Sequence, residues 1–163
     1  MTRAFLSLGS NLGARLGYLR TATDALRRGP LLTVRAVSRV YETAPVEVEE
    51  EQQPYYLNCV VEVWYGAAAI ELLRFCQGIE AALGRERQGE KAPRTIDIDV
   101  LLFGKEIMEG QHLVVPHPGT LRAFNLKALA DLAPDMYIPG RGVVRELLTG
   151  ADLGGVRECR EGL

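Results

Sequence analysis

The sequence contains few of the residues that build disulfide frameworks, zinc sites or membrane spans. Its three cysteines, Cys59, Cys76 and Cys159, are odd in number and form no C-x-x-C pair, and the chain has only two histidines. We therefore expect free, mostly buried thiols in a reducing cytoplasm and no zinc site. No apolar run approaches the roughly 20 residues that a membrane-spanning helix needs, so no membrane partner is expected.

Lysine and net charge are also scarce. Only Lys91, Lys105 and Lys127 among the 19 basic residues are lysines, and the formal net charge is -2. This balance gives no general attraction to nucleic acid, so an anion site has to come from locally clustered arginines. Both common nucleotide-binding motifs, G-x-x-x-x-G-K-[ST] and G-x-G-x-x-G, are missing.

The apolar pattern predicts a single α+β domain over residues 1–163. Alternation and β-branched residues predict strands at 3–10, 32–43, 57–66, 95–103 and 112–117. Helical spacing predicts helices at 12–28, 67–83, 122–132 and 143–149. The order β-α-β-β-α-β predicts a ferredoxin-like split βαβ fold, an antiparallel sheet with helices packed on one face. Two long polar segments, 44–56 and 84–94, are expected to be functional loops.

Asp97-Ile98-Asp99 places two acidic residues inside an otherwise apolar strand. Side chains alternate between the faces of a strand, so both aspartates share one face, about 6.5–7 Å apart. At an effective dielectric near 20 their repulsion amounts to about 2–3 kcal/mol. A divalent cation would offset this cost, and Mg²⁺ prefers carboxylate, water and phosphate oxygens. The structural alternative is an exposed edge-strand face with arginine partners.

Four basic residues, Arg85, Arg87, Lys91 and Arg94, lie within the segment that leads into this pair. Taken alone, they fit a solvated loop paired with neighbouring glutamates. Beside the aspartates they favour a polyphosphate site, because arginine binds phosphate and stabilises the charge that develops during phosphoryl transfer.

Several motifs occur in the order and spacing of one known family: SLGSNLG, YETAPV, PYYLN, QGIE with LGRER, PRTIDIDVLLFG, and VPHP with RAF. On these residues the sequence resembles the hydroxymethyldihydropterin pyrophosphokinases of folate biosynthesis over residues 4–148. The resemblance implies a ferredoxin-like fold with long catalytic loops. It also implies transfer of the pyrophosphoryl group of ATP to the hydroxymethyl oxygen of the pterin, with release of AMP.

The resemblance further implies roles for individual residues. The catalytic residues are Arg85, Arg94, Asp97 and Asp99, with the two aspartates as ligands of two Mg²⁺ ions. The ATP-binding residues are Gln77, Arg87, Val100, His112, Leu113, His117 and Arg122. The pterin-binding residues are Tyr56 and Phe124, which enclose the ring, and Asn58, Thr43, Pro45 and Val46 at its hydrogen-bonding edge.

Two other functions stay open. A ferredoxin-like fold also serves non-catalytic modules that bind a small ligand or RNA, although an acidic face would repel phosphate unless a metal were bound. A kinase that transfers only the γ-phosphoryl group would use the same kinds of residue, and its product would be ADP rather than AMP. Whether the protein transfers a pyrophosphoryl or a γ-phosphoryl group, we expect small-molecule substrates, no nucleic-acid partner and a monomer.

Overall fold

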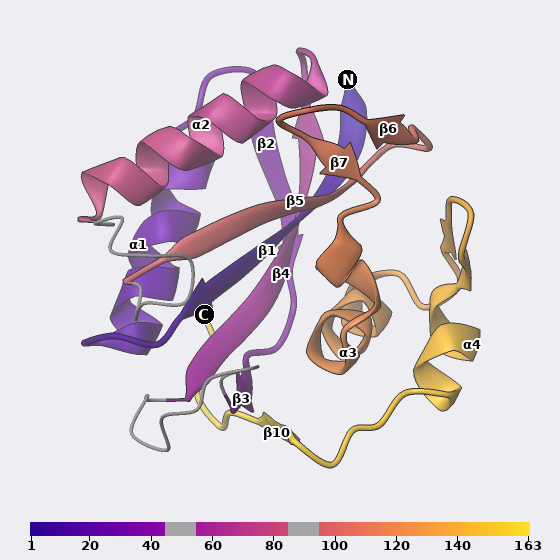
Figure 1. Cartoon of the computed structure of the whole chain (residues 1–163). Helices are drawn as coiled ribbons and strands as arrows, with labels where there is room; N and C mark the ends of the chain where they lie inside the picture. The colour runs from indigo at the N-terminus through magenta and orange to yellow at the C-terminus, as the bar shows by residue number, and fades with distance from the viewer. Residues whose placement is uncertain (45–54, 85–94) are drawn as a thin grey trace.

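An antiparallel sheet forms the centre of the computed structural model, which describes residues 1–44, 55–84 and 95–163 (Figure 1). Its strands are β1 (Thr2–Ser10), β2 (Leu32–Val37), β3 (Tyr41–Thr43), β4 (Tyr56–Tyr65), β5 (Asp97–Phe103) and β10 (Val156–Glu158). They lie in the order β10-β3-β4-β1-β5, and β2 pairs with the second half of β4. Strand β1 is therefore central, between β4 and β5, with both of its neighbours antiparallel.

Helices cover both faces of this sheet. They are α1 (Arg15–Arg27), α2 (Ala69–Ala82), α3 (Ala123–Leu132) and α4 (Val144–Thr149). Helices α1 and α2 lie on one face, as Figure 1 shows, which confirms the predicted ferredoxin-like arrangement. Helix α3 packs on the opposite face, here called the α3 face, with α4 beside it. The expectation that the helices pack on one face therefore holds for α1 and α2 only. In the part of the chain that the structure describes, every helix is too short or too polar to cross a membrane.

The remaining strands and the 3-10 helix are short. Strands β6 (Met108–Glu109) and β7 (Val114–Val115) form one pair, β8 (Tyr137–Ile138) and β9 (Gly142–Val143) form another, and the 3-10 helix η1 (Pro118–Leu121) precedes α3. The strand predicted at 112–117 is thus reduced to two residues, and the helix predicted from residue 12 begins at residue 15.

The prediction of a single strand at 32–43 is wrong in one respect. This segment forms two strands, β2 and β3, with a break that begins at Ser38. The backbone N–H of Ser38 donates to the carbonyl of Val60 at 2.9 Å. Its hydroxyl accepts the N–H of Val60 at 2.8 Å, in place of a strand carbonyl. The chain can therefore leave the second half of β4 and pair again with the first half, where β3 places Tyr41 and Thr43 opposite Asn58 and Tyr56.

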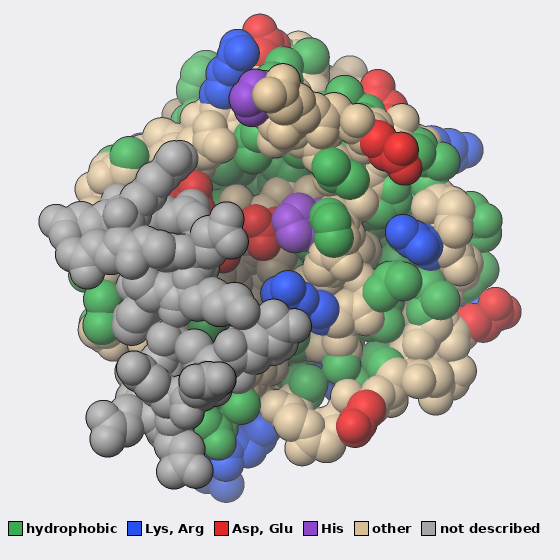
Figure 2. Space-filling model, viewed as in Figure 1, with side chains coloured by type: hydrophobic (Ala, Val, Ile, Leu, Met, Phe, Trp, Pro, Cys, Tyr) green, Lys and Arg blue, Asp and Glu red, His purple; other side chains and the backbone are tan. Residues whose placement is uncertain are grey.

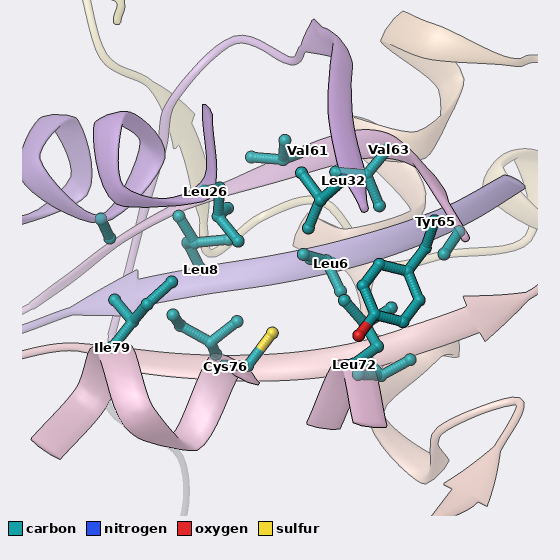
Figure 3. Packing of buried hydrophobic residues seen from close by; sticks show 14 of the residues in the cluster. Leu6, Leu8, Leu26, Leu32, Val61, Val63, Tyr65, Leu72, Cys76 and Ile79 are labelled. Atoms are coloured by element: carbon teal, nitrogen blue, oxygen red, sulfur yellow. The ribbon is translucent and has the colours of Figure 1, made fainter. Parts of the chain in front are cut away.

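The alternation of β1 and β4 divides the apolar residues between two cores. One core lies between the sheet and the helices α1 and α2. There the strand residues Leu6, Leu8, Val61 and Val63 pack in one cluster with Leu72, Cys76 and Ile79 of α2 (Figure 3). Toward α3 point Phe5, Val60 and Leu101, which pack with Leu126 and Leu129.

Cys59 and Cys76 are buried free thiols, as the sequence predicted. Burial raises the pKa of Cys59 to about 12, and burial also raises the pKa of Cys76, where the neighbouring carboxylates add to the effect. Because the thiolate is the reactive form, neither residue is a nucleophile at neutral pH.

Candidate active site

Asp97 and Asp99 share one face of β5, as the alternation predicted, and this face is the α3 face. Ile98 and Val100 point the other way, into the core beneath α1 and α2. Both aspartates are half-buried, and 39% of the Asp99 side chain is exposed. Figure 2 shows acidic side chains next to a histidine beside a hollow on this side of the molecule. The two carboxylates are therefore accessible to a ligand without standing in bulk solvent.

His117 is the histidine that approaches this pair. Its Nε2 atom lies 3.7 Å from Oδ1 of Asp99, and its backbone N–H donates to the carbonyl of Leu101 on β5 at 2.9 Å. Its Nδ1 atom accepts the N–H of Gly119 at 2.9 Å. A ring nitrogen that accepts a hydrogen bond carries no proton, so the neutral ring carries its proton on Nε2, on the side of Asp99.

Gly9 places no side chain in the middle of this face, although the residue itself is buried. Its partners on the two neighbouring strands are Asp97 on β5 and Asn58 on β4. A Cβ atom at Gly9 would lie 3.0 Å from Oδ1 of Asn58 and 3.5 Å from the ring of Tyr56. The amide nitrogen of Asn58 donates to the hydroxyl of Thr43 at 2.9 Å, which fixes the amide oxygen on the Gly9 side. Three residues predicted to bind the pterin thus meet around a glycine, a residue type that often marks a close approach of a ligand to the backbone of a strand.

Helix α3 is fixed on this face by a hydrogen bond near each of its ends. Asn125 accepts from the hydroxyl of Ser7 on β1 at 2.9 Å, and Asp131 accepts from the hydroxyl of Tyr41 at 2.6 Å. Burial, with this bond to Asp131 as the next cause, raises the pKa of Tyr41 well above its usual value. Both bonds hold the helix against the sheet and so fix the position of Phe124, which is half-buried in its first turn.

The other predicted site residues are not all brought to this face. Val100 and Leu113 are buried in the core beneath α1 and α2, so their side chains do not reach the aspartates. Three others occupy exposed positions: Gln77 on α2, His112 between β6 and β7, and Arg122 directly after η1. Outside the described residues lie Pro45, Val46, Arg85, Arg87 and Arg94.

Sequence reasoning missed Glu80, a buried carboxylate of α2 with only 3% of its surface exposed. Its Oε2 atom accepts the backbone N–H of Ile98 at 2.9 Å. Ile98 separates the two aspartates, and β5 is the last strand in the order of the sheet. Glu80 therefore fixes the strand segment that presents both carboxylates. Next to the apolar stripe of a helix, a single glutamate gives no sequence signal for such a role.

We expect Glu80→Ala to lower the free energy of unfolding by about 1–3 kcal/mol, because a buried N–H loses its acceptor. Glu80→Gln keeps an acceptor oxygen and should cost less. Urea unfolding followed by far-ultraviolet circular dichroism measures both changes. Arg74→Ala, at an exposed position of the same helix, is the control, and equal stability of the Glu80→Ala and Arg74→Ala variants would contradict this role.

The donor atoms of this face fit magnesium. Within residues 1–44, 55–84 and 95–163, no three His, Cys, Asp or Glu residues are grouped closely enough to hold a metal ion by themselves. Two carboxylates on a rigid strand can supply some of the oxygen ligands of Mg²⁺, which usually completes its coordination with water and substrate phosphates. These residues therefore suit a metal that arrives with a nucleotide.

Comparison with known proteins agrees with this geometry. Residues 5–134 match the family described as 7,8-dihydro-6-hydroxymethylpterin-pyrophosphokinase. The chain belongs to this family. A pyrophosphokinase of Bacillus subtilis with the same pterin in its name is 44% identical over 130 residues, which are 79% of this chain and 77% of the relative. Its counterpart in Methylorubrum extorquens is 41% identical over 157 residues, 96% of this chain and 98% of the relative.

Solved structures that carry this family's domain share the fold. A crystal structure of HPPK-DHPS in complex with substrates superposes with a TM-score of 0.70 at 16% identity, over 91% of this chain and 43% of that chain. The wild-type HPPK-DHPS of Plasmodium falciparum gives the same TM-score and covers 91% of this chain and 41% of that chain. The chain spans less than half of these solved chains, so the likeness concerns the fold alone.

Family membership confirms the activity expected from the sequence. The protein is an ATP-dependent diphosphokinase of folate biosynthesis, which transfers the pyrophosphoryl group of ATP to the hydroxymethyl group of the dihydropterin. The alternative of a non-catalytic binding module is not favoured.

Proposed function

We propose that Asp97 and Asp99 hold two Mg²⁺ ions during this reaction and that the two substrates meet at Asp97. The observation that carries the proposal is the row of cross-strand partners Asp97, Gly9 and Asn58, with Asp99 and Ser7 in the next row. When bound, the ions would neutralise charge on the triphosphate and lower the pKa of the attacking hydroxyl.

The pterin would lie on the backbone of Gly9. Asn58 and Thr43 would form hydrogen bonds with the polar edge of the pterin, and Tyr56 would stack on one face of its ring. Offset aromatic stacking contributes about 0.5–1.5 kcal/mol beyond the buried area. Phe124, at the start of α3, would stack on the other face. This arrangement directs the hydroxymethyl group of the pterin toward β5.

The triphosphate would lie against Asp99 and His117, where Nε2–H of the neutral imidazole can donate to a phosphate oxygen. Arg122 is close in sequence to η1 and would bind the phosphates. Gln77 and His112, which are exposed, would contact the rest of the nucleotide with their side chains. Val100 and Leu113, whose side chains are buried, would contact it through their backbone. Arg85, Arg87 and Arg94 would bind the triphosphate from the preceding segment. The hydroxymethyl oxygen would then attack the β-phosphorus, and the bond between this phosphorus and the AMP oxygen would break.

We also propose that the chain acts as one domain over residues 1–163, as a monomer in the cytoplasm. One sheet with an apolar core on each side supports the single domain. The buried free thiols Cys59 and Cys76 fit a reducing compartment.

Counting metal ions tests the proposal. In the presence of a non-hydrolysable ATP analogue, titration with Mn²⁺ followed by electron paramagnetic resonance should show two bound ions per chain. Asp97→Asn and Asp99→Asn should each reduce that number. In parallel, ATP and the hydroxymethyldihydropterin should give AMP and the pterin pyrophosphate in equal amounts, and only when Mg²⁺ is added. A single ion, or unchanged Mn²⁺ binding in both variants, would refute the metal assignment.

A further inference from the structure

Asn125 connects three elements on the α3 face, and its side chain is 4% exposed. Its amide oxygen accepts from the hydroxyl of Ser7 on β1 at 2.9 Å. Its amide nitrogen donates to the carbonyl of Gly119 in η1 at 2.8 Å. Both hydrogen-bonding atoms of the side chain are thus used, one toward the sheet and the other toward the turn that follows His117.

These bonds complete a closed ring of contacts. Ser7 is the cross-strand partner of Asp99, and Asn125 links Ser7 to Gly119. The N–H of Gly119 donates to Nδ1 of His117 at 2.9 Å, and Nε2 of His117 lies 3.7 Å from Asp99. The contacts thus run from Asp99 on β5 through Ser7, Asn125, Gly119 and His117 and end again at Asp99.

The ring leaves little room for His117 to move. A Cβ atom at Gly119 would lie 3.2 Å from Nδ1 of His117, so the imidazole already packs against the backbone of η1. The carbonyl of Gly119 accepts from Asn125 and from the N–H of Arg122 at 3.1 Å, which fixes the peptide plane of this turn. The position of η1 relative to β1 therefore depends on Asn125.

We infer that Asn125 is a positioning residue for the nucleotide site. It holds η1 so that Gly119 keeps the proton of neutral His117 on Nε2, on the side of Asp99. This inference deepens the proposed function, because it assumes that the triphosphate lies against Asp99 and His117. Residues that orient a metal-ligating histidine in a comparable way typically affect metal affinity or activity by 10- to 100-fold, and we expect an effect of this order here.

The tautomer of His117 can be measured without any substrate. We suggest long-range ¹H–¹⁵N correlation spectra of protein labelled at histidine, at a pH about two units above the ordinary histidine pKa of about 6.5. The chain has only two histidines, so a His112→Gln variant assigns the signals. The parent protein should show one tautomer of His117, protonated on Nε2. In Asn125→Ala the two nitrogen shifts of His117 should move toward each other, as both tautomers become populated.

Two further variants separate positioning from packing. Asn125→Leu fills the space without hydrogen bonds, so it tests the inference if the alanine variant does not fold. Leu129→Ala removes a fully buried side chain from the same helix but leaves the ring intact, and it should keep the parent tautomer.

The same variants should separate in steady-state kinetics. We expect kcat/KM for ATP to fall about tenfold or more in Asn125→Ala and Asn125→Leu, and to stay near the parent value in Leu129→Ala. An unchanged tautomer in both Asn125 variants, or a kinetic loss no larger than that of Leu129→Ala, would overturn the inference. Failure of the proposed function is a different result, because the parent protein would then show the single tautomer but no magnesium-dependent formation of AMP.

Discussion

Replacing Asp97 or Asp99 by alanine is expected to lower kcat by about a thousandfold or more while the protein stays folded. Each tenfold loss of rate corresponds to 1.36 kcal/mol of transition-state stabilisation, and charge stabilisation by a bound metal is worth several kcal/mol. The free energy of unfolding should stay the same or rise by up to about 1 kcal/mol. The repulsion of about 2–3 kcal/mol between the carboxylates is relieved, but water already screens part of it at half-buried positions.

Activity and stability together decide this prediction. Chromatography of the nucleotide product gives kcat, and urea unfolding gives the free energy. Asp24→Ala is the matched control, because Asp24 is an exposed aspartate of α1 with an arginine partner, Arg27. That variant should keep the parent rate. A variant of Asp97 or Asp99 that retains most of its activity would rule out the metal assignment, and one that unfolds would show that the pair is structural.

The acidic face of β5 could be predicted from the sequence because it depends only on local alternation. Asp97 and Asp99 had to share a face opposite Ile98 whatever the sheet packed against. The same rule places Val100 opposite Asp99, and the structure does bury Val100 in the core. The place of Val100 in the nucleotide site was implied by the family resemblance and does not follow from the alternation.

The second layer of the fold could not be predicted in the same way. The apolar spacing predicted α3, but which face of the sheet it covers depends on long-range contacts such as those of Tyr41 with Asp131 and Ser7 with Asn125. These pairs are 90 and 118 residues apart in sequence, and neither has a local pattern. The roles of Glu80 and Asn125 depend on such contacts and were therefore missed.

Gly9 is the position at which a small change should have the largest effect on pterin binding. We expect Gly9→Ala to weaken binding of the hydroxymethyldihydropterin at least tenfold, which corresponds to about 1.4 kcal/mol. The added methyl group would lie 3.0 Å from Oδ1 of Asn58, closer than an unstrained contact. Asn58 cannot simply move away, because its amide nitrogen is bonded to Thr43. The methyl group would also stand on the backbone where the flat ring is proposed to lie.

Isothermal titration with the pterin, in the presence of a non-hydrolysable ATP analogue, measures this loss, and titration with the analogue alone provides the comparison. Nucleotide affinity should stay within about threefold of the parent value, because the atoms nearest to the added methyl group belong to Tyr56, Leu57 and Asn58 of β4 and not to Asp99 or His117. Gly78→Ala is the control, since a Cβ atom there meets no other atom within 4 Å and should stabilise α2 by about 0.5–1 kcal/mol. If Gly9→Ala lowered the affinities for both ligands equally, the sheet would be distorted. Unchanged pterin affinity would show that the pterin does not bind at Gly9.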